Sequence, residues 1–189
     1  METAIALVDC QNFYCSCERV FDPSLRHRPV AVLSNNDGCV IARSEEVKEA
    51  GVEMGAPYFE AEGLLRYIGA EVFSSNYALY GDMSRRVRAV LKRFAVELEA
   101  YSIDECFLAL PRMERGRARR VGERIREAVR RLVGVPVRVG IGRTKTLAKL
   151  ASYEAKENLR AGLGGGVFVE PGEREGQVAF LEGVPAGEV

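Results

Sequence analysis

The segment from Val96 to Leu110, VELEAYSIDECFLAL, constrains the fold more than any other. We expect two β-strands here, one at Val96 to Ser102 and one at the apolar run Cys106 to Leu110, and the residues between them predict a tight turn. Asp104 and Glu105 therefore lie at the border between a turn and a hydrophobic strand. A carboxylate in such a place is costly to bury unless it is paired or bound to a metal ion.

A second apolar run, AIALVDC from Ala4 to Cys10, predicts a buried strand that also ends near an acidic residue, Asp9. Further strands are expected at Pro29 to Ser34, Pro136 to Ile141 and Val167 to Val169. Helices are expected at Asn12 to Phe21, Ser44 to Ala50, Pro57 to Leu65, Asn76 to Phe94, Arg112 to Val133 and Thr144 to Asn158, with a weaker helical pattern at Glu173 to Glu182.

This alternation predicts an α/β or α+β domain, in which Asp37 to Asn76 forms a small helical insertion. The length of 189 residues suits such a domain with a buried core. No run approaches the roughly 20 apolar residues of a membrane span, and the start METAIALVDC lacks the basic flank of a signal peptide. We therefore expect a soluble, cytoplasmic protein. The end at Val189, without a capping element, predicts that the chain is part of a longer one.

The five cysteines and the single histidine, His27, exclude several classes of function. The cysteines form no CxxC pair and are too few for a disulfide scaffold, so we expect buried, reduced thiols. One histidine cannot complete a Cys/His zinc set, and it disfavours Ser-His-Asp or Cys-His catalysis. Any chemistry must rest on carboxylates, lysines, hydroxyls or a metal ion.

The formal net charge of zero conceals a basic region. Between Arg112 and Arg160 there are 15 Lys and Arg residues against 5 Asp and Glu residues. Such a region on a neutral chain is typical of a surface that binds a polyanion, although a solvated helix face has the same composition.

Asp9, Asp104 and Glu105 are the residues best suited to chemistry. Three carboxylates that converge repel one another unless divalent cations compensate their charge. Oxygen ligands without histidine favour Mg²⁺ over zinc, and a pair of such ions suits an in-line phosphoryl displacement. Taken singly, each residue has a simpler interpretation, in which Asp9 caps the following helix and Asp104-Glu105 only forms part of a β-turn.

Lys145, Lys149 and Lys156 are spaced so that they share one helix face. This row could neutralise a triphosphate or a nucleic-acid backbone, and a solvated face explains it equally well. Phe13 and Tyr14 directly follow the strand that ends near Asp9, where a bound base and sugar could pack against them. Core packing is the alternative for Phe13.

Five motifs occur in a fixed order between Ile5 and about Val169. They are VDCQNFYCSCE (8–18), LSNNDGCVIARS (33–44), SSNYALYGDMS (74–84), YSIDECFL (101–108) and GIGRTKTLAKLA (140–151). Together they resemble the Y-family DNA polymerases, the low-fidelity enzymes of lesion bypass. The motifs SNNDGCVIARS and SSNY are similar to those of the UmuC branch.

The resemblance implies an α+β fold with a ferredoxin-like palm at residues 1–23 and 77–169. A small fingers domain is then expected at residues 24–76, and the start of a truncated thumb at 170–189. The family continues with a helix-hairpin-helix thumb and a little-finger domain. This chain ends about where that thumb begins, so these domains are expected to be absent or truncated here.

The resemblance also implies roles for individual residues. Asp9, Asp104 and Glu105 would be the catalytic carboxylates that hold two Mg²⁺ ions, with the carbonyl of Cys10 as a further ligand. Tyr14 matches the steric gate, whose ring would clash with the 2′-hydroxyl of a ribonucleotide.

Phe13 would flank the nucleotide, while Lys48 and Lys156 lie where basic residues of the family contact the triphosphate. Lys145 and Lys149 are candidates for contacts with DNA. At Glu45 many family members carry a triphosphate-binding tyrosine, and at the position of Lys48 many carry arginine. Glutamate cannot donate to phosphate, and lysine is a point charge rather than a bidentate fork.

The function implied is template-directed transfer of dNMP to a primer 3′-hydroxyl, in DNA repair and in damage-induced (SOS) mutagenesis. The partners implied are primer-template DNA, dNTP, an accessory protein, a recombinase filament and the sliding clamp, with no membrane. Two alternatives stay open at this point. One is a nucleotidyl cyclase on a related palm, and the other is a DNA-binding accessory subunit whose catalytic site has lapsed.

Overall fold

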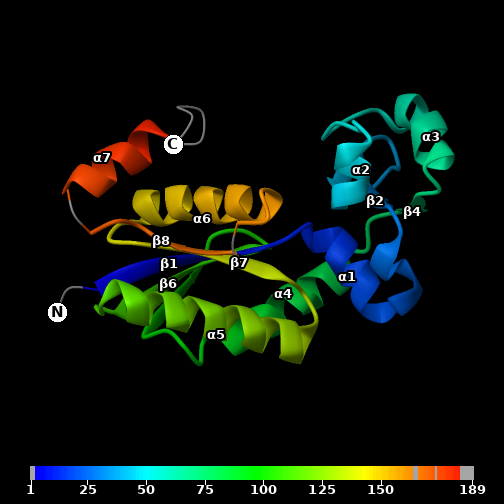
Figure 1. Ribbon diagram of the computed structural model, residues 1–189. Coiled ribbons are helices and arrows are strands. Elements are labelled where there is room, and N and C mark those ends of the chain that lie inside the picture. Colours follow the sequence, from blue (N-terminus) through cyan, green and yellow to red (C-terminus); the bar gives the residue numbers. More distant parts are fainter. Residues whose placement is uncertain (1–2, 164–165, 173, 184–189) are drawn as a thin grey trace. The chain divides into compact units, whose positions relative to one another are not determined.

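The computed structural model describes residues 3–163, 166–172 and 174–183. The chain divides into two compact units. The large unit consists of Met1–Cys10 and Ser84–Val189, and the inserted unit consists of Gln11–Met83. Figure 1 shows the helices and strands of both.

A five-stranded sheet forms the centre of the large unit, with the strand order β5-β6-β1-β7-β8. Strand β1 is antiparallel to both of its neighbours, β6 and β7, and β8 runs parallel to β7. The strands are β1 (Thr3–Cys10), β5 (Glu97–Ala100), β6 (Glu105–Pro111), β7 (Val137–Gly142) and β8 (Val167–Val169). The buried central position of β1 explains its continuous apolar sequence.

Helices cover the two faces of this sheet, with α6 (Lys145–Arg160) on one face and α5 (Arg115–Val133) on the other (Figure 1). Helix α6 approaches β7 closely because Gly140 has no side chain. A Cβ atom there would lie 2.1 Å from the backbone nitrogen of Ser152. Leu7 packs with Phe107 and with Ala148 of α6. Since side chains alternate along a strand, Asp9 lies on this same face as Leu7.

The inserted unit contains a three-stranded sheet of order β3-β2-β4 with short helices around it. Its core is formed by Leu33, Val40, Val47, Val52 and Leu65 together with smaller residues. The elements are α1 (Phe13–Phe21), a 3₁₀ helix (Pro23–His27), β2 (Val30–Leu33), β3 (Val40–Arg43), α2 (Glu45–Glu49), α3 (Tyr58–Tyr67) and β4 (Glu71–Phe73), and α4 (Tyr77–Leu91) continues into the large unit.

The predicted α+β class and the apolar strands are confirmed, as is the helix at the C-terminal end, α7 (Arg174–Glu182). The expectation of a helical insertion over Asp37 to Asn76 is wrong, because β3 and β4 lie within it. Strand β4 has only three residues, too few to show an alternating pattern, and it forms by pairing in parallel with β2.

The five cysteines are free thiols, four of them buried, as expected. Within the part of the chain that the structure describes, none of the helices combines the length and hydropathy required to cross a membrane.

Candidate active site

The strand register of the large unit brings the predicted carboxylates together. Asp9 of β1 is the register partner of Glu105 at the start of β6, and on its other side it is the partner of Arg138 in β7. Partners across neighbouring strands point to the same face of a sheet. Asp9, Glu105 and Arg138 therefore form one cross-strand row on the face that α6 covers.

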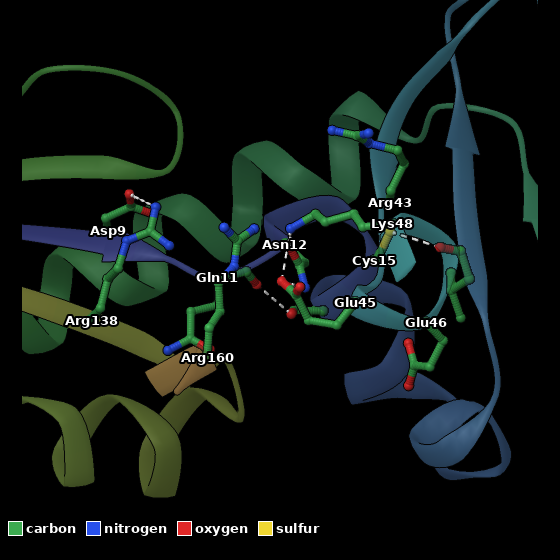
Figure 2. A network of polar contacts seen from close by, with 12 residues as sticks. Asp9, Gln11, Asn12, Cys15, Arg43, Glu45, Glu46, Lys48, Arg138 and Arg160 are labelled. Atoms are coloured by element: carbon green, nitrogen blue, oxygen red, sulfur yellow. Dashed lines mark hydrogen bonds and ion pairs between the residues drawn. The ribbon is translucent and has the colours of Figure 1, made fainter. Parts of the chain in front are cut away.

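Asp9 is the most buried of the three carboxylates, with a side chain that is 13% exposed. Its Oδ2 accepts a hydrogen bond from the guanidinium of Arg138, which is 21% exposed (Figure 2). Burial raises the pKa of Asp9 to about 6, while Arg138 opposes that rise and the negative charges of Glu105 and Asp104 add to it. The simpler interpretation, in which Asp9 caps the following helix, is wrong, because Asn12 is the N-cap residue of α1.

Ser102 organises the turn that carries the other two carboxylates. Its hydroxyl donates to Oδ1 of Asp104 at 2.6 Å and accepts from the backbone N–H of Glu105 at 3.0 Å. The backbone N–H of Cys10 donates to the carbonyl of Asp104 at 3.0 Å, which ties the turn to the end of β1. Burial and the charge of Asp104 raise the pKa of Glu105, and Lys149 opposes that rise.

The chemistry of these donors fits a hard divalent cation. The charges of Glu105 and Asp104 raise the pKa of Asp9, and the charge of Asp104 raises the pKa of Glu105, which is the situation that a cation relieves. Among the described residues, no group of three or more Asp, Glu, His or Cys side chains is arranged to hold a metal ion. Asp9 instead uses Arg138 as its counter-ion.

The lysines of α6 point to different partners. Lys145 pairs with Glu99 at 2.5 Å and lies over the ring of Phe107, and Lys149 lies over the ring of Tyr101. The field of Lys149 also reaches Glu105. Lys156 lies further along the helix, with its ammonium over the ring of Tyr153.

In the inserted unit, Phe13 is buried, in agreement with the core alternative, and Tyr14 belongs to an aromatic cluster. The Tyr14 ring stacks on that of Tyr80, with centroids 4.1 Å apart and planes at 13°, and it meets Tyr77 edge-on. Tyr80 is buried, and its hydroxyl donates to Glu18 at 2.7 Å. One face of the Tyr14 ring is therefore held by Tyr80, which is itself fixed by burial and by its hydrogen bond to Glu18.

Lys48 belongs to a closed polar network in the same unit (Figure 2). Its ammonium donates to Oε1 of Glu45 at 2.8 Å and to the side-chain oxygen of Asn12. The amide nitrogen of Asn12 in turn donates to Glu45 at 3.2 Å. Asn12 has a positive φ of 47°, which asparagine adopts more readily than most residues.

A family model described as the impB/mucB/samB family matches residues 8–153. The chain belongs to this family. Among its relatives, Protein ImpB of Salmonella typhimurium is 45% identical over 186 residues, which are 97% of this chain and 43% of that protein. Protein UmuC of Salmonella typhimurium is 50% identical over 153 residues, which are 80% of this chain and 36% of that protein.

The fold is similar to that of solved polymerase structures. An insertion ternary complex of Dbh DNA polymerase matches with a TM-score of 0.82 at 24% identity, over 98% of this chain and 53% of that chain. DinB from Sulfolobus solfataricus matches with a TM-score of 0.75 over 88% of this chain and 48% of that chain. The predicted resemblance to the UmuC branch of the Y-family is confirmed. The chain spans about two-fifths of the length of the curated impB/mucB/samB relatives it matches.

Two residues at the site of this family member were not found by sequence reasoning. Ser102 lies within the quoted motif YSIDECFL, and its place two residues before Asp104 is a typical position for a turn-forming hydroxyl. Arg138 is one of many arginines in a basic region, and nothing local distinguishes it. Its contact with Asp9 depends on strand register alone.

Proposed function

We propose that this chain is the palm and fingers portion of a translesion DNA polymerase, which transfers dNMP from a dNTP to a primer 3′-hydroxyl on a DNA template. The observation that carries the proposal is the register pairing of Asp9 with Glu105, beside Asp104, at one end of the sheet. Membership of the impB/mucB/samB family supports it. We assign the palm to residues 1–23 and 77–169, the fingers to 24–76 and the start of a thumb to 170–189.

In this proposal Asp9, Asp104, Glu105 and the carbonyl of Cys10 hold two Mg²⁺ ions. When bound, these ions neutralise charge on the phosphates and lower the pKa of the attacking hydroxyl. The protein keeps the carboxylates in place through Ser102 and through the backbone bond from Cys10 to Asp104. Because the carboxylates are already held in place, no free energy is spent on reorganising them during the reaction.

Nucleotide binding is assigned to Phe13, Tyr14, Lys48 and Lys156, and contacts with the DNA backbone to Lys145 and Lys149. The stack of Tyr14 on Tyr80 supports a role as steric gate, because a ring held from one side presents a firm edge to the sugar. The proposed partners are primer-template DNA and, by family resemblance, an accessory protein, a recombinase filament and the sliding clamp. The cytoplasm is the proposed compartment.

Substitution Asp104→Ala tests the enzymatic assignment. Mg²⁺-dependent incorporation of a single dNTP on a primed template by the whole protein should fall by at least about a thousandfold, because the charge that compensates the cations is lost. Glu62→Ala, which removes a carboxylate from the exposed pair with Arg66, is the matched control and should retain incorporation. DNA binding without incorporation by the native protein would favour an accessory subunit, and a cyclic product without DNA would favour a cyclase.

Substitution Tyr14→Ala tests the gate. We expect the variant to incorporate ribonucleotides at least about tenfold more readily relative to deoxyribonucleotides, a discrimination of the size that steric exclusion provides. Tyr67→Ala, at an exposed tyrosine that ends α3, is the control. Unchanged sugar discrimination in Tyr14→Ala would remove this assignment.

A further inference from the structure

Arg138 has an unusual position for a surface-type residue. It lies on an interior strand of the sheet, directly across from Asp9, and most of its side chain is buried. One terminal nitrogen binds Asp9, whereas its Nε is buried and has no hydrogen-bond partner in the described structure. A buried donor that stays unsatisfied is unfavourable. The ion pair with Asp9 is therefore the interaction that offsets the cost of burying the Arg138 side chain.

Arg138 carries a positive charge on a planar guanidinium. It touches Asp9, which belongs with Glu105 and Asp104 to a group of three carboxylates. Lys149, from α6, is a further cation, and its field acts on Glu105. Arg138 is the one of these two cations for which the structure records an ion pair with Asp9.

We propose that Arg138 is a built-in counter-ion that holds Asp9 in the metal-free protein and competes with divalent metal for it. The inference rests on the proposed metal site and adds a residue that sets how much metal is needed to fill it. A cation bound by Asp9 would lie close to the guanidinium, and like charges at short range repel strongly where water is excluded. Metal loading then requires Asp9 to loosen or leave its contact with Arg138.

A purely supportive role makes the opposite prediction. If Arg138 stayed bound to Asp9 and oriented it toward the metal, as residues behind metal ligands commonly do, its removal would weaken metal binding. If Arg138 competes, its removal strengthens binding. The sign of the change therefore distinguishes the two roles.

The experiment measures Mn²⁺ binding to the whole protein without DNA or nucleotide, from the electron paramagnetic resonance signal of free Mn²⁺. We expect Arg138→Gln to bind Mn²⁺ about tenfold more tightly than the native protein, as expected when one nearby positive charge is removed from a poorly solvated site. Arg138→Lys keeps the charge but lacks the forked guanidinium, so its Mn²⁺ affinity should lie between those of the native protein and Arg138→Gln. Arg119→Gln is the matched control, because it removes the same charge from an exposed pair with Glu123 on α5, and it should stay within about twofold of native.

A double-mutant cycle separates competition from a general field. In the Asp9→Asn background, Arg138→Gln should change the Mn²⁺ affinity by no more than the Arg119→Gln control, because the shared carboxylate is gone. Arg138→Lys keeps the test valid if Arg138→Gln does not fold, which a thermal melt reveals.

Unchanged or weaker Mn²⁺ binding in Arg138→Gln and Arg138→Lys would overturn the inference. If native binding is lost in Asp104→Ala but does not respond to Arg138, the metal site stands and the competitor role fails. If the native protein shows no Mn²⁺ binding that depends on Asp104, both fail.

Discussion

The carboxylate–cation pairs Asp9–Arg138 and Glu45–Lys48 are built in opposite ways. Asp9 and Arg138 are 129 residues apart in the chain, lie on neighbouring strands and are both mostly buried. Glu45 and Lys48 lie on one short helix, α2, with side chains that are 53% and 25% exposed. The first pair exists because of sheet register, and the second because of a local three-residue spacing.

This difference has energetic consequences. A pair whose carboxylate is exposed, such as Glu45 with Lys48, gains little, since water screens it and long side chains must be ordered. A buried pair gains little net free energy from forming, but removing one member leaves a charge that is poorly solvated. We therefore expect the pair in the large unit to be difficult to separate and the pair in the inserted unit to exchange readily with solvent or with a phosphate.

Substitution Gly140→Ala is expected to have the largest effect, because it disturbs the packing beneath the Asp9 row. The new Cβ would lie 2.1 Å from the backbone nitrogen of Ser152 and 2.3 Å from the carbonyl of Ala148, and backbone atoms cannot rotate away. We expect a loss of about 3 kcal/mol or more in the free energy of unfolding. Urea denaturation of the whole protein measures it.

Gly63→Ala in α3 of the inserted unit is the control, because a Cβ there meets nothing within 4 Å. It should leave stability unchanged or raise it by up to about 1 kcal/mol, as alanine does in a helix interior. Native-like stability of Gly140→Ala would show that α6 does not pack on β7 as described.

Substitutions Arg138→Gln and Lys48→Gln compare the two pairs directly. Arg138→Gln should reduce the free energy of unfolding by about 2 kcal/mol, since Asp9 then lies beside Glu105 and Asp104 without a counter-ion. Lys48→Gln should cost no more than about 0.5 kcal/mol. Equal losses in thermal or urea unfolding would contradict the distinction between a register-built and a local pair.

Substitution Glu45→Gln tests whether the local pair limits the proposed triphosphate contact. Neutralising Glu45 releases the ammonium of Lys48 from a charged competitor, so the KM for dNTP should fall by about two- to threefold, the size of an exposed ion pair. Glu49→Gln, the same charge change on the same helix, should leave KM at its native value. A rise in KM for Glu45→Gln would instead show that Glu45 positions Lys48 productively.

Much of the fold followed from local patterns. The run AIALVDC and the hairpin around Asp104 predicted strands correctly, and the apolar runs of β1 and β6 are those that a buried strand requires. Strand β4 was missed, because its three residues become a strand only through their pairing with β2. The sequence predicted that Asp9 lies near Glu105, and the antiparallel register of β1 and β6 shows that the two residues are partners.

The sequence alone was sufficient to identify the family and most of the strand and helix pattern, and to select the three carboxylates as candidates, because these depend on residue type and short-range spacing. It was not sufficient to select Arg138 from the many arginines between Arg112 and Arg160. Strand register aligns one residue of β7 with Asp9, and a shift of a single residue would turn that side chain to the other face. The counter-ion of the candidate active site is thus a property of sheet assembly, which no local pattern encodes.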